Sequence, residues 1–335
     1  MAPQVQRFGT TADGRAVEAL HLRGGELRVA LLTYGATLQD LRLAGTPWPL
    51  TLGAGSVAAY EGPFAYFGAV VGPVANRIAG ARALIGGQLH QFTANEAGCT
   101  TLHSGPTGTH AQVWQIEDAT EASATLRLDL ADGLGGFPGN RTLRAKFELI
   151  APTTLGLALS ATSDAPTLIN LANHSYWNLD GSADTGGHRL TVAADHYLPV
   201  GAALIPGAPV DVTGTAFDFR ASRSLDRNPA LDHNFCLATS PRALTPAATL
   251  EGARGVRLDL ATTAPGLQVY DGRRLATAPW PGLMGEPHGP YAGVALEPQH
   301  WPDAPNRPEF PPILLAPGET YRQATTFSFS RDAGA

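Results

Sequence analysis

The chain has 335 residues, 44% of them hydrophobic, and a formal net charge of −6 at pH 7. This composition is ordinary for a globular protein with a sizeable core, and the acidic balance argues against nucleic acid and anionic membranes as partners. Segment 1–15 lacks the pattern of a signal peptide. The most apolar stretch, 65–75, is much shorter than the roughly 20 residues of a membrane helix. We therefore expect a soluble, cytoplasmic protein, with Cys99 and Cys236 as buried free thiols.

Apolar and polar residues alternate with a period of two in several segments, which predicts half-buried strands. The alternation is clearest in 126–130, 143–149, 256–260 and 325–330. Asp-Gly, Gly-Gly and Pro-Gly pairs separate such segments and indicate turns. The sequence shows neither a helical stripe, nor a βαβ alternation, nor a repeat of fixed period. The prediction is an all-β fold, a large antiparallel β-sandwich.

Segment 240–255 is rich in Ala, Pro and Thr and could be read as a linker between domains. Strand-like sequence resumes on both sides of it, so we interpret it as a long surface loop. On that interpretation residues 1–335 form a single domain, since all-β sandwiches of this length are common.

Two segments place a proton-transfer group among apolar, aromatic and amide side chains, a composition typical of a pocket for a small polar ligand. In the first, NLANHSYWN (170–178), His174 stands among three asparagines and is followed by Tyr176 and Trp177. Amides can fix the orientation and tautomer of an imidazole ring, and aromatic faces suit the apolar side of a sugar. The alternative is a core histidine whose ring is satisfied by backbone groups.

In the second segment, Glu297 follows the apolar run 293–296, and a carboxylate in so apolar a strand is usually paired or functional. The alternative is a strand-end glutamate that faces solvent. The proline-rich stretch that follows contains His300, Trp301 and Asp303, and we expect it to be extended and to form a rigid wall beside the carboxylate. A histidine and a carboxylate that face each other across one ligand form an acid–base pair.

Three further residues qualify as candidates: Arg77 in ANRIAG, His103 in TLHSG and Asp232 in LDHNF. Taken alone, each could equally cap a strand, form a surface salt bridge or stabilise a turn. The sequence contains no HExxH, no paired CxxC, no GxGxxG opening a helix, no GxxxxGK[ST] and no GxSxG. We therefore expect no metal and no cofactor.

These strings resemble the aldose 1-epimerase (galactose mutarotase) family over nearly the whole chain. Each string is weak by itself, whereas their common order along the chain is specific. The matching strings are GATLQDL (35–41), YFGAVVG with ANRIAG (66–80), TLHSG (101–105), NLANHSYWNL (170–179), PVDVTGTAFDFR (209–220), LDHNF (231–235), PGLQVYDG (265–272) and LEPQHWPDAPNRPEFPP (296–312) followed by LLAPGETYR.

The resemblance implies a galactose-mutarotase-type β-sandwich, acting as a monomer or homodimer on a free monosaccharide such as galactose or glucose. By motif, His174 matches the general acid of the family and Glu297 its general base. Ring opening in this scheme requires a protonated histidine and an ionised glutamate at the same time. Four further positions match residues that bind sugar in the family: Asn76, Arg77, His103 and Asp232.

The chain departs from the family pattern at four positions, none of them the acid or the base. The departures are Pro73, where an arginine is common, Ser104, where a glycine is usual, and exchanged aromatic residues at Trp177 and Trp301.

Three alternatives to the epimerase interpretation stay open. A glycoside hydrolase would use Asp232 and Glu297 as two carboxyl groups, roughly 5–9.5 Å apart, and would leave His174 without a role. A hexose-phosphate epimerase could share the fold, although the sequence shows no arginine cluster for a phosphate. A non-catalytic sugar-binding module should lack one of the two proton-transfer groups.

Overall fold

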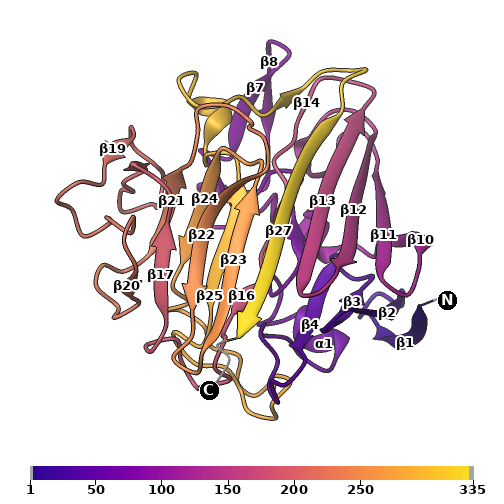
Figure 1. Cartoon of the computed structure of the whole chain (residues 1–335). Helices are drawn as coiled ribbons and strands as arrows, with labels where there is room; N and C mark the ends of the chain where they lie inside the picture. The colour runs from indigo at the N-terminus through magenta and orange to yellow at the C-terminus, as the bar shows by residue number, and fades with distance from the viewer. Residues whose placement is uncertain (1–2, 332–335) are drawn as a thin grey trace.

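The computed structural model describes residues 3–331 (Figure 1). Its largest layer is a nine-stranded sheet, and a six-stranded sheet lies behind it in the view of Figure 1. A four-stranded sheet at the N-terminal end and several two-stranded ladders surround these two layers. Neighbouring strands within every one of these sheets run antiparallel, as in the ladders β12–β13 and β24–β25. The predicted all-β antiparallel fold is confirmed.

The order of the strands in space differs from their order along the chain in both large sheets. Across the nine-stranded sheet, neighbouring strands follow the order β10 (Gln115–Ala119), β11 (Ser123–Leu130), β12 (Arg141–Ile150), β13 (Thr154–Ser163), β27 (Tyr321–Arg331), β23 (Val256–Thr262), β22 (Thr245–Glu251), β17 (Arg189–Val192) and β20 (Arg223–Ser224). Across the six-stranded sheet, they follow the order β16 (Tyr176–Trp177), β25 (Val294–Gln299), β24 (Gly266–Tyr270), β21 (Asp232–Cys236), β18 (His196–Tyr197) and β19 (Val210–Asp211).

The smaller elements complete the fold. The four-stranded sheet consists of β1 (Gln4–Thr10), β2 (Ala16–Gly24), β3 (Leu27–Leu32) and β4 (Thr37–Leu43). The paired short strands are β5 (Val70–Val71) with β15 (Ala172–Asn173), β6 (Arg77–Ala79) with β9 (Thr100–Leu102), β7 (Arg82–Ile85) with β8 (Gln88–Gln91), and β14 (Thr167–Leu168) with β26 (Leu314–Leu315). The helical pieces are α1 (Val57–Tyr60), η1 (Gly105–Thr107), η2 (Thr109–Ala111), η3 (Leu134–Gly136) and η4 (Ala304–Asn306).

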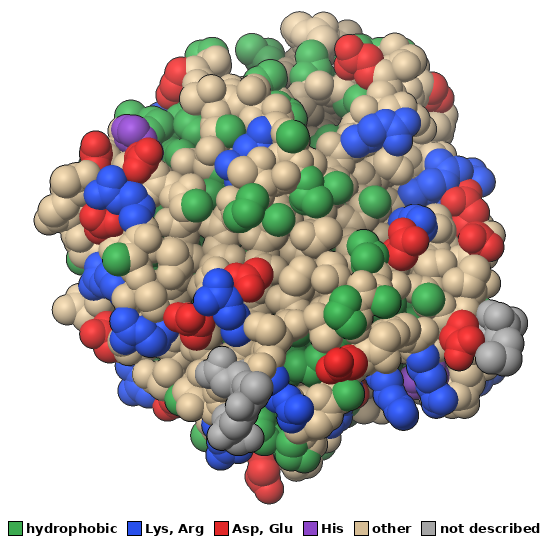
Figure 2. Space-filling view, viewed as in Figure 1, with side chains coloured by type: hydrophobic (Ala, Val, Ile, Leu, Met, Phe, Trp, Pro, Cys, Tyr) green, Lys and Arg blue, Asp and Glu red, His purple; other side chains and the backbone are tan. Residues whose placement is uncertain are grey.

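The predicted alternation is realised in the nine-stranded sheet. In β12, Leu143 and Phe147 are buried, whereas Lys146 and Glu148 are exposed and pair at 2.8 Å. Successive strand side chains point to opposite faces, so one face of the sheet enters the core and the other meets water. Figure 2 shows this outer face, on which basic and acidic side chains are mixed rather than gathered by sign.

The inner face of the nine-stranded sheet packs against the six-stranded sheet. The buried Trp177 of β16 lies with its ring centroid 5.1 Å from that of Phe327 and 5.7 Å from that of Phe329, both on β27. Aromatic side chains bury roughly 150–250 Å² each. Their contact therefore contributes strongly to holding the two layers together.

Two expectations about local features are wrong. Segment 240–255 contains β22, a strand of the nine-stranded sheet, rather than a long loop. Its inward residues include Ala247 and Ala248, which are buried but too small to mark a strand in the sequence. Cys99 is exposed and Cys236 is half-buried; both are free.

Among residues 3–331, no helix is long and apolar enough to cross a membrane.

Gly68 joins the four-stranded sheet to the segment that carries His174. Its carbonyl accepts hydrogen bonds from the Leu38 N–H and the Asn173 side chain, and its N–H donates to the His174 carbonyl at 3.0 Å. Its φ of +69° is left-handed, and a Cβ at this position would collide with the Leu38 carbonyl. Only glycine fits this crossing without strain.

Replacing Gly68 with alanine should lower the free energy of unfolding by more than the same change at Gly133. Gly133 has a similar φ of +75° but open space around it. Left-handed alanine costs roughly 1–2 kcal/mol in either place, so the difference between the two variants isolates the collision with Leu38. Urea unfolding of both variants measures this difference. Equal losses of stability would show that the backbone crossing adjusts without cost.

Candidate active site

The β25 strand turns Glu297 away from the core because side chains alternate along it. Val294 and Leu296 belong to the core between the two large sheets. Ala295 and Glu297 therefore face the opposite side of the six-stranded sheet. The carboxylate is nevertheless buried, because other segments of the chain cover this side as well.

The neighbouring strands extend the same polar face. On β24, Leu267 and Val269 lie in the core, which leaves Gln268 in register with Glu297 on the polar side. On the next strand, β21, Asp232 accepts a hydrogen bond of 2.7 Å from Nε2 of Gln268. A row of carboxyl and amide groups thus crosses three adjacent strands.

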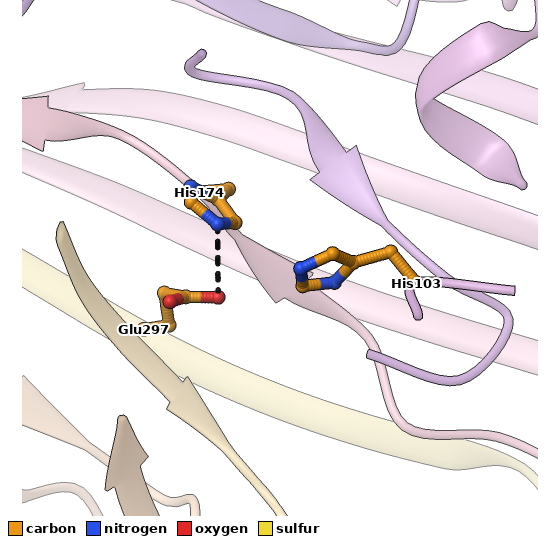
Figure 3. Close-up of side chains that lie close together, drawn as sticks. All are labelled: His103, His174 and Glu297. Carbon is orange, nitrogen blue, oxygen red and sulfur yellow. Dashed lines mark ion pairs between the residues drawn. The ribbon is translucent and has the colours of Figure 1, made fainter. Parts of the chain in front are cut away.

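His174 reaches this face from the short link between β15 and β16. Its backbone N–H donates to the Ala69 carbonyl at 2.8 Å, which fixes the link against the segment before β5. The imidazole Nε2 lies 3.6 Å from Oε2 of Glu297, and the two side chains are only 6% and 3% exposed (Figure 3). The fold therefore brings the predicted acid and base together.

Asn76, Arg77 and His103 approach from the β6–β9 ladder. The backbone N–H of Asn76 donates to Nδ1 of His103 at 3.1 Å, and the N–H of His103 donates to the Asn76 carbonyl at 2.9 Å. Both residues have positive φ, +63° for Asn76 and +49° for His103. Such left-handed conformations cost about 1–3 kcal/mol each, and they are concentrated at functional sites.

All six residues chosen from the sequence line a single cavity of about 190 Å³. A larger cavity of about 500 Å³ lies between segments 49–53, 178–184 and 283–290. We place the site in the smaller cavity because it alone of the two contains a histidine within reach of a carboxylate. The remaining lining residues, which the motifs did not assign to the site, are Tyr66, Glu96, Leu102, Tyr176, Tyr270 and Arg274.

Burial controls the protonation of His174 and Glu297. It lowers the pKa of His174 to about 4. It also raises the pKa of Glu297 well above the usual range, with the charge of Asp232 adding to this effect and that of Arg77 opposing it. Both shifts favour a neutral imidazole beside a neutral carboxylic acid, an arrangement in which the pair holds one proton, on Glu297. The charged histidine and ionised glutamate required for ring opening contain the same number of protons in the opposite arrangement.

Arg77 is held by a residue that the sequence analysis missed. Its Nε and Nη2 donate to the two carboxylate oxygens of Glu96 at 2.6 and 2.8 Å. Burial by itself would lower the pKa of Arg77, but the Glu96 hydrogen bonds and the nearby charge of Asp232 raise it above its ordinary value. The surroundings of Glu96, TANEAG, are those of an ordinary polar turn, so no local signal marked it.

Aromatic rings form the apolar walls of the cavity. The Tyr66 ring centroid lies 4.8 Å from that of His103 and 5.9 Å from that of His174. The Tyr176 centroid lies 5.1 Å from that of His174 and 6.2 Å from that of Tyr270. A sugar has apolar C–H faces as well as hydroxyls, and aromatic walls suit those faces.

Ligand atoms of His103, His174 and Glu297 lie within 4.8 Å of one another, a spacing that could hold a metal ion. The hydrogen bonding of His103 does not fit this use. Its Nδ1 accepts the Asn76 N–H, so the neutral ring carries its proton on Nε2. A ring nitrogen that carries a proton can donate to a hydroxyl of a bound small molecule, but it cannot coordinate a metal ion.

The asparagines around His174 do not hold its ring, contrary to expectation. Asn170 accepts from the His300 N–H, Asn173 donates to the Gly68 carbonyl and Asn178 donates to the Ala292 carbonyl, each at 2.8 Å. Nδ1 of His174 has no hydrogen-bond partner among the described residues. The amides therefore brace the backbone around the site.

The aromatic and proline-rich segments also differ from expectation. Trp177 lies in the core instead of facing the ligand, because it alternates with Tyr176 along β16. The stretch after Glu297 contains the turn η4, and neither Trp301 nor Asp303 lines the cavity. Asp303 accepts the Ala79 N–H at 2.9 Å and so supports the strand of Arg77 from behind.

The four departures from the family pattern are likewise outside the cavity. The Ser104 hydroxyl accepts a hydrogen bond from the Val74 N–H at 2.9 Å and donates one to the Val74 carbonyl at 3.1 Å. The Trp301 side chain donates to the Pro265 carbonyl at 3.0 Å. The cavity is not lined by Ser104 or Trp301, nor by Pro73 or Trp177. These exchanges therefore affect the scaffold rather than the contacts to a ligand.

Comparison with known proteins agrees with this geometry. The family model described as aldose 1-epimerase matches residues 18–328. The galactose mutarotase of Rattus norvegicus is 38% identical over 95% of this chain and 96% of its own length, and the aldose 1-epimerase of Escherichia coli is 34% identical with the same coverage of both chains. An aldose epimerase homologue from C. elegans has a similar structure, with a TM-score of 0.88 and 28% identity over 94% of this chain and 99% of its own. The chain belongs to the aldose 1-epimerase family.

Proposed function

We propose that this protein is a mutarotase that interconverts the α and β anomers of a free aldohexose such as galactose or glucose. The observation that carries the proposal is the buried pair of His174 Nε2 and Glu297 Oε2, 3.6 Å apart in a cavity lined by hydroxyl-binding groups. A non-catalytic sugar-binding module would not need both groups. The similarity to enzymes named galactose mutarotase supports galactose as a substrate.

The reaction follows from two proton transfers. Glu297, as carboxylate, accepts the proton of the C1 hydroxyl while protonated His174 gives a proton to the ring oxygen. The C1–O5 bond breaks, an open-chain aldehyde forms, and rotation about C1–C2 presents its other face. Reclosure returns both protons, so the enzyme ends in its starting state. An acid or a base in position typically contributes about 10²–10⁴-fold each.

The other polar groups are suited to hydroxyl binding and charge control. His103 offers Nε2–H as a donor because its Nδ1 is occupied by Asn76. Arg77 lowers the pKa of Glu297, which favours the ionised base that the reaction needs. Asp232 is oriented by Gln268 and can accept from a sugar hydroxyl.

The charges of the cavity favour a neutral substrate. Three carboxyl groups line it, those of Glu96, Asp232 and Glu297, against two arginines. Arg77 is already bound by Glu96. A phosphosugar would therefore have one remaining arginine of the lining, Arg274, to bind its phosphate. A glycoside hydrolase is also less well supported, because its two carboxyl groups leave the buried histidine beside Glu297 without a task.

The chain also suits a simple assembly. We propose one domain, because the largest cluster of buried hydrophobic residues includes residues from Leu20 to Phe329. A monomer or homodimer is sufficient, because one chain supplies a complete cavity. The exposed free thiol of Cys99 supports the reducing cytoplasm as the location.

Replacing Glu297 with glutamine should reduce turnover roughly 10²–10⁴-fold while galactose still binds, because the amide keeps the shape but cannot accept the proton. Polarimetry on freshly dissolved α-D-galactose and α-D-glucose measures the rate, and calorimetry measures binding. Glu148→Gln, on the exposed face of β12, is the control. Near-normal turnover in the Glu297 variant would refute its role as base, and an inactive wild type would refute the mutarotase proposal.

Activity should show a bell-shaped dependence on pH. The acidic limb arises when a second proton enters the pair, governed by the pKa of about 4 for His174. The alkaline limb arises when the shared proton leaves, and the raised pKa of Glu297 moves this limb upward. Values of kcat/KM against pH, after subtraction of the spontaneous rate, report the pair as a whole. An acidic limb centred at the ordinary histidine value of about 6.5 would contradict this assignment.

Removal of metal ions should leave the activity unchanged, because His103 presents a protonated nitrogen toward the other two potential ligands. The test is polarimetry before and after dialysis against a strong chelator, followed by titration with Co²⁺ to detect a coordination spectrum. Loss of activity that Zn²⁺ restores would show that the Asn76–His103 hydrogen bond rearranges to allow coordination.

A further inference from the structure

The side-on contact between Arg77 and Glu96 is the closest ion pair of the cavity. Nε and Nη2 of the guanidinium meet the two carboxylate oxygens at 2.6 and 2.8 Å, the planar bidentate geometry that arginine favours. The Arg77 side chain is 8% exposed and that of Glu96 is 28% exposed. Glu96 therefore lies nearer the mouth of the cavity and pairs with the more deeply buried Arg77.

This contact determines which part of the guanidinium faces the ligand. With the Nε and Nη2 edge occupied, Nη1 is the nitrogen turned toward the inner acids, and it lies 3.9 Å from Oδ2 of Asp232. That distance is too long for a hydrogen bond. Nη1 is therefore free to donate to a hydroxyl placed between the two residues.

An unheld Arg77 would find other partners in the same cavity. Asp232 and Glu297 both lie close enough to influence its charge. A buried guanidinium without its own carboxylate would move toward one of them, since an unpaired buried charge is costly. Pairing with Glu297 would occupy the base and take it out of the reaction.

We propose that Glu96 is a positioning residue for the reaction: by binding the Nε and Nη2 edge of Arg77, it presents Nη1 to the sugar and keeps the guanidinium from pairing with the base Glu297. This inference rests on the proposed mutarotase function. Glu96 need not touch the reacting atoms, because it acts through Arg77.

The proposal has an electrostatic consequence at the base. The charged or titratable groups that face Glu297 are His174, Asp232, Arg77, His103 and Tyr176. Among them Arg77 lowers the pKa of Glu297. Glu96 offsets part of that positive charge, so neutralising Glu96 strengthens the effect of Arg77. The pKa of Glu297 then falls, and the alkaline limb of the pH profile moves to lower pH.

The test is the pH profile of Glu96→Gln, measured by polarimetry with galactose. We expect the alkaline limb to move down by about one pH unit and kcat to fall about tenfold, because Arg77 competes for the base. Glu96→Asp retains the charge and should keep the alkaline limb near its wild-type position. If Glu96→Gln only weakened sugar binding, KM would rise while kcat and the alkaline limb stayed unchanged. That outcome would overturn the proposal.

Glu117→Gln provides a matched control. Glu117 binds Nε and Nη2 of Arg144 at 2.7 and 2.8 Å, the same side-on pair, with side chains 31% and 38% exposed on the nine-stranded sheet. This variant should keep the wild-type profile. An equal shift in both variants would overturn the proposal, since it would reflect the loss of any surface charge. If wild type itself fails to accelerate mutarotation, the function is wrong; if only the Glu96→Gln shift is missing, the role of Glu96 alone is wrong.

Discussion

The burial of His174 against Glu297 is the constraint on which the rest of the site depends. Two ionisable groups deprived of water resist carrying charge, so burial drives the pair toward a neutral imidazole and a neutral acid. A pair that shares one proton can exchange it with a sugar without importing charge from solvent. The packing of the two large sheets positions Glu297 for this exchange. One face of β25 lies in the core between the sheets, and Glu297 lies on the other face of the same strand.

The charges around His174 and Glu297 are balanced by residues that lie successively farther from these two side chains. Asp232 raises the pKa of Glu297, Arg77 lowers it, and Glu96 binds Arg77 from the cavity mouth. Gln268 in turn orients Asp232. Each group restrains the next, and on our proposal Glu96 keeps the one buried arginine of the cavity from a direct ion pair with Glu297. Arg77 thereby offsets part of the rise in the pKa of Glu297 that burial and Asp232 cause.

The backbone beneath the cavity is held in unusual conformations by hydrogen bonds. Asn76, His103 and Asp303 all have left-handed φ although none is glycine. Asn76 and His103 bond to each other, and the Asp303 N–H donates to the Arg77 carbonyl at 2.9 Å. These contacts fix the tautomer of His103 and the direction of Arg77. The same contacts that strain the chain also make His103 a hydrogen-bond donor and a poor metal ligand.

The sequence by itself determined the all-β fold class, several of the strands and six residues of the cavity. The alternation with a period of two in 143–149 and 256–260 follows from strand geometry, which depends only on neighbouring residues. The motifs around His174 and Glu297 were recognisable because their residues are contiguous in the sequence. Only the tertiary structure decided which side each residue faces and what it touches. Trp177 entered the core, the asparagines braced the backbone, and Glu96 became the partner of Arg77. Hydrogen bonds and burial between distant segments have no local pattern, and they set the protonation of the acid–base pair.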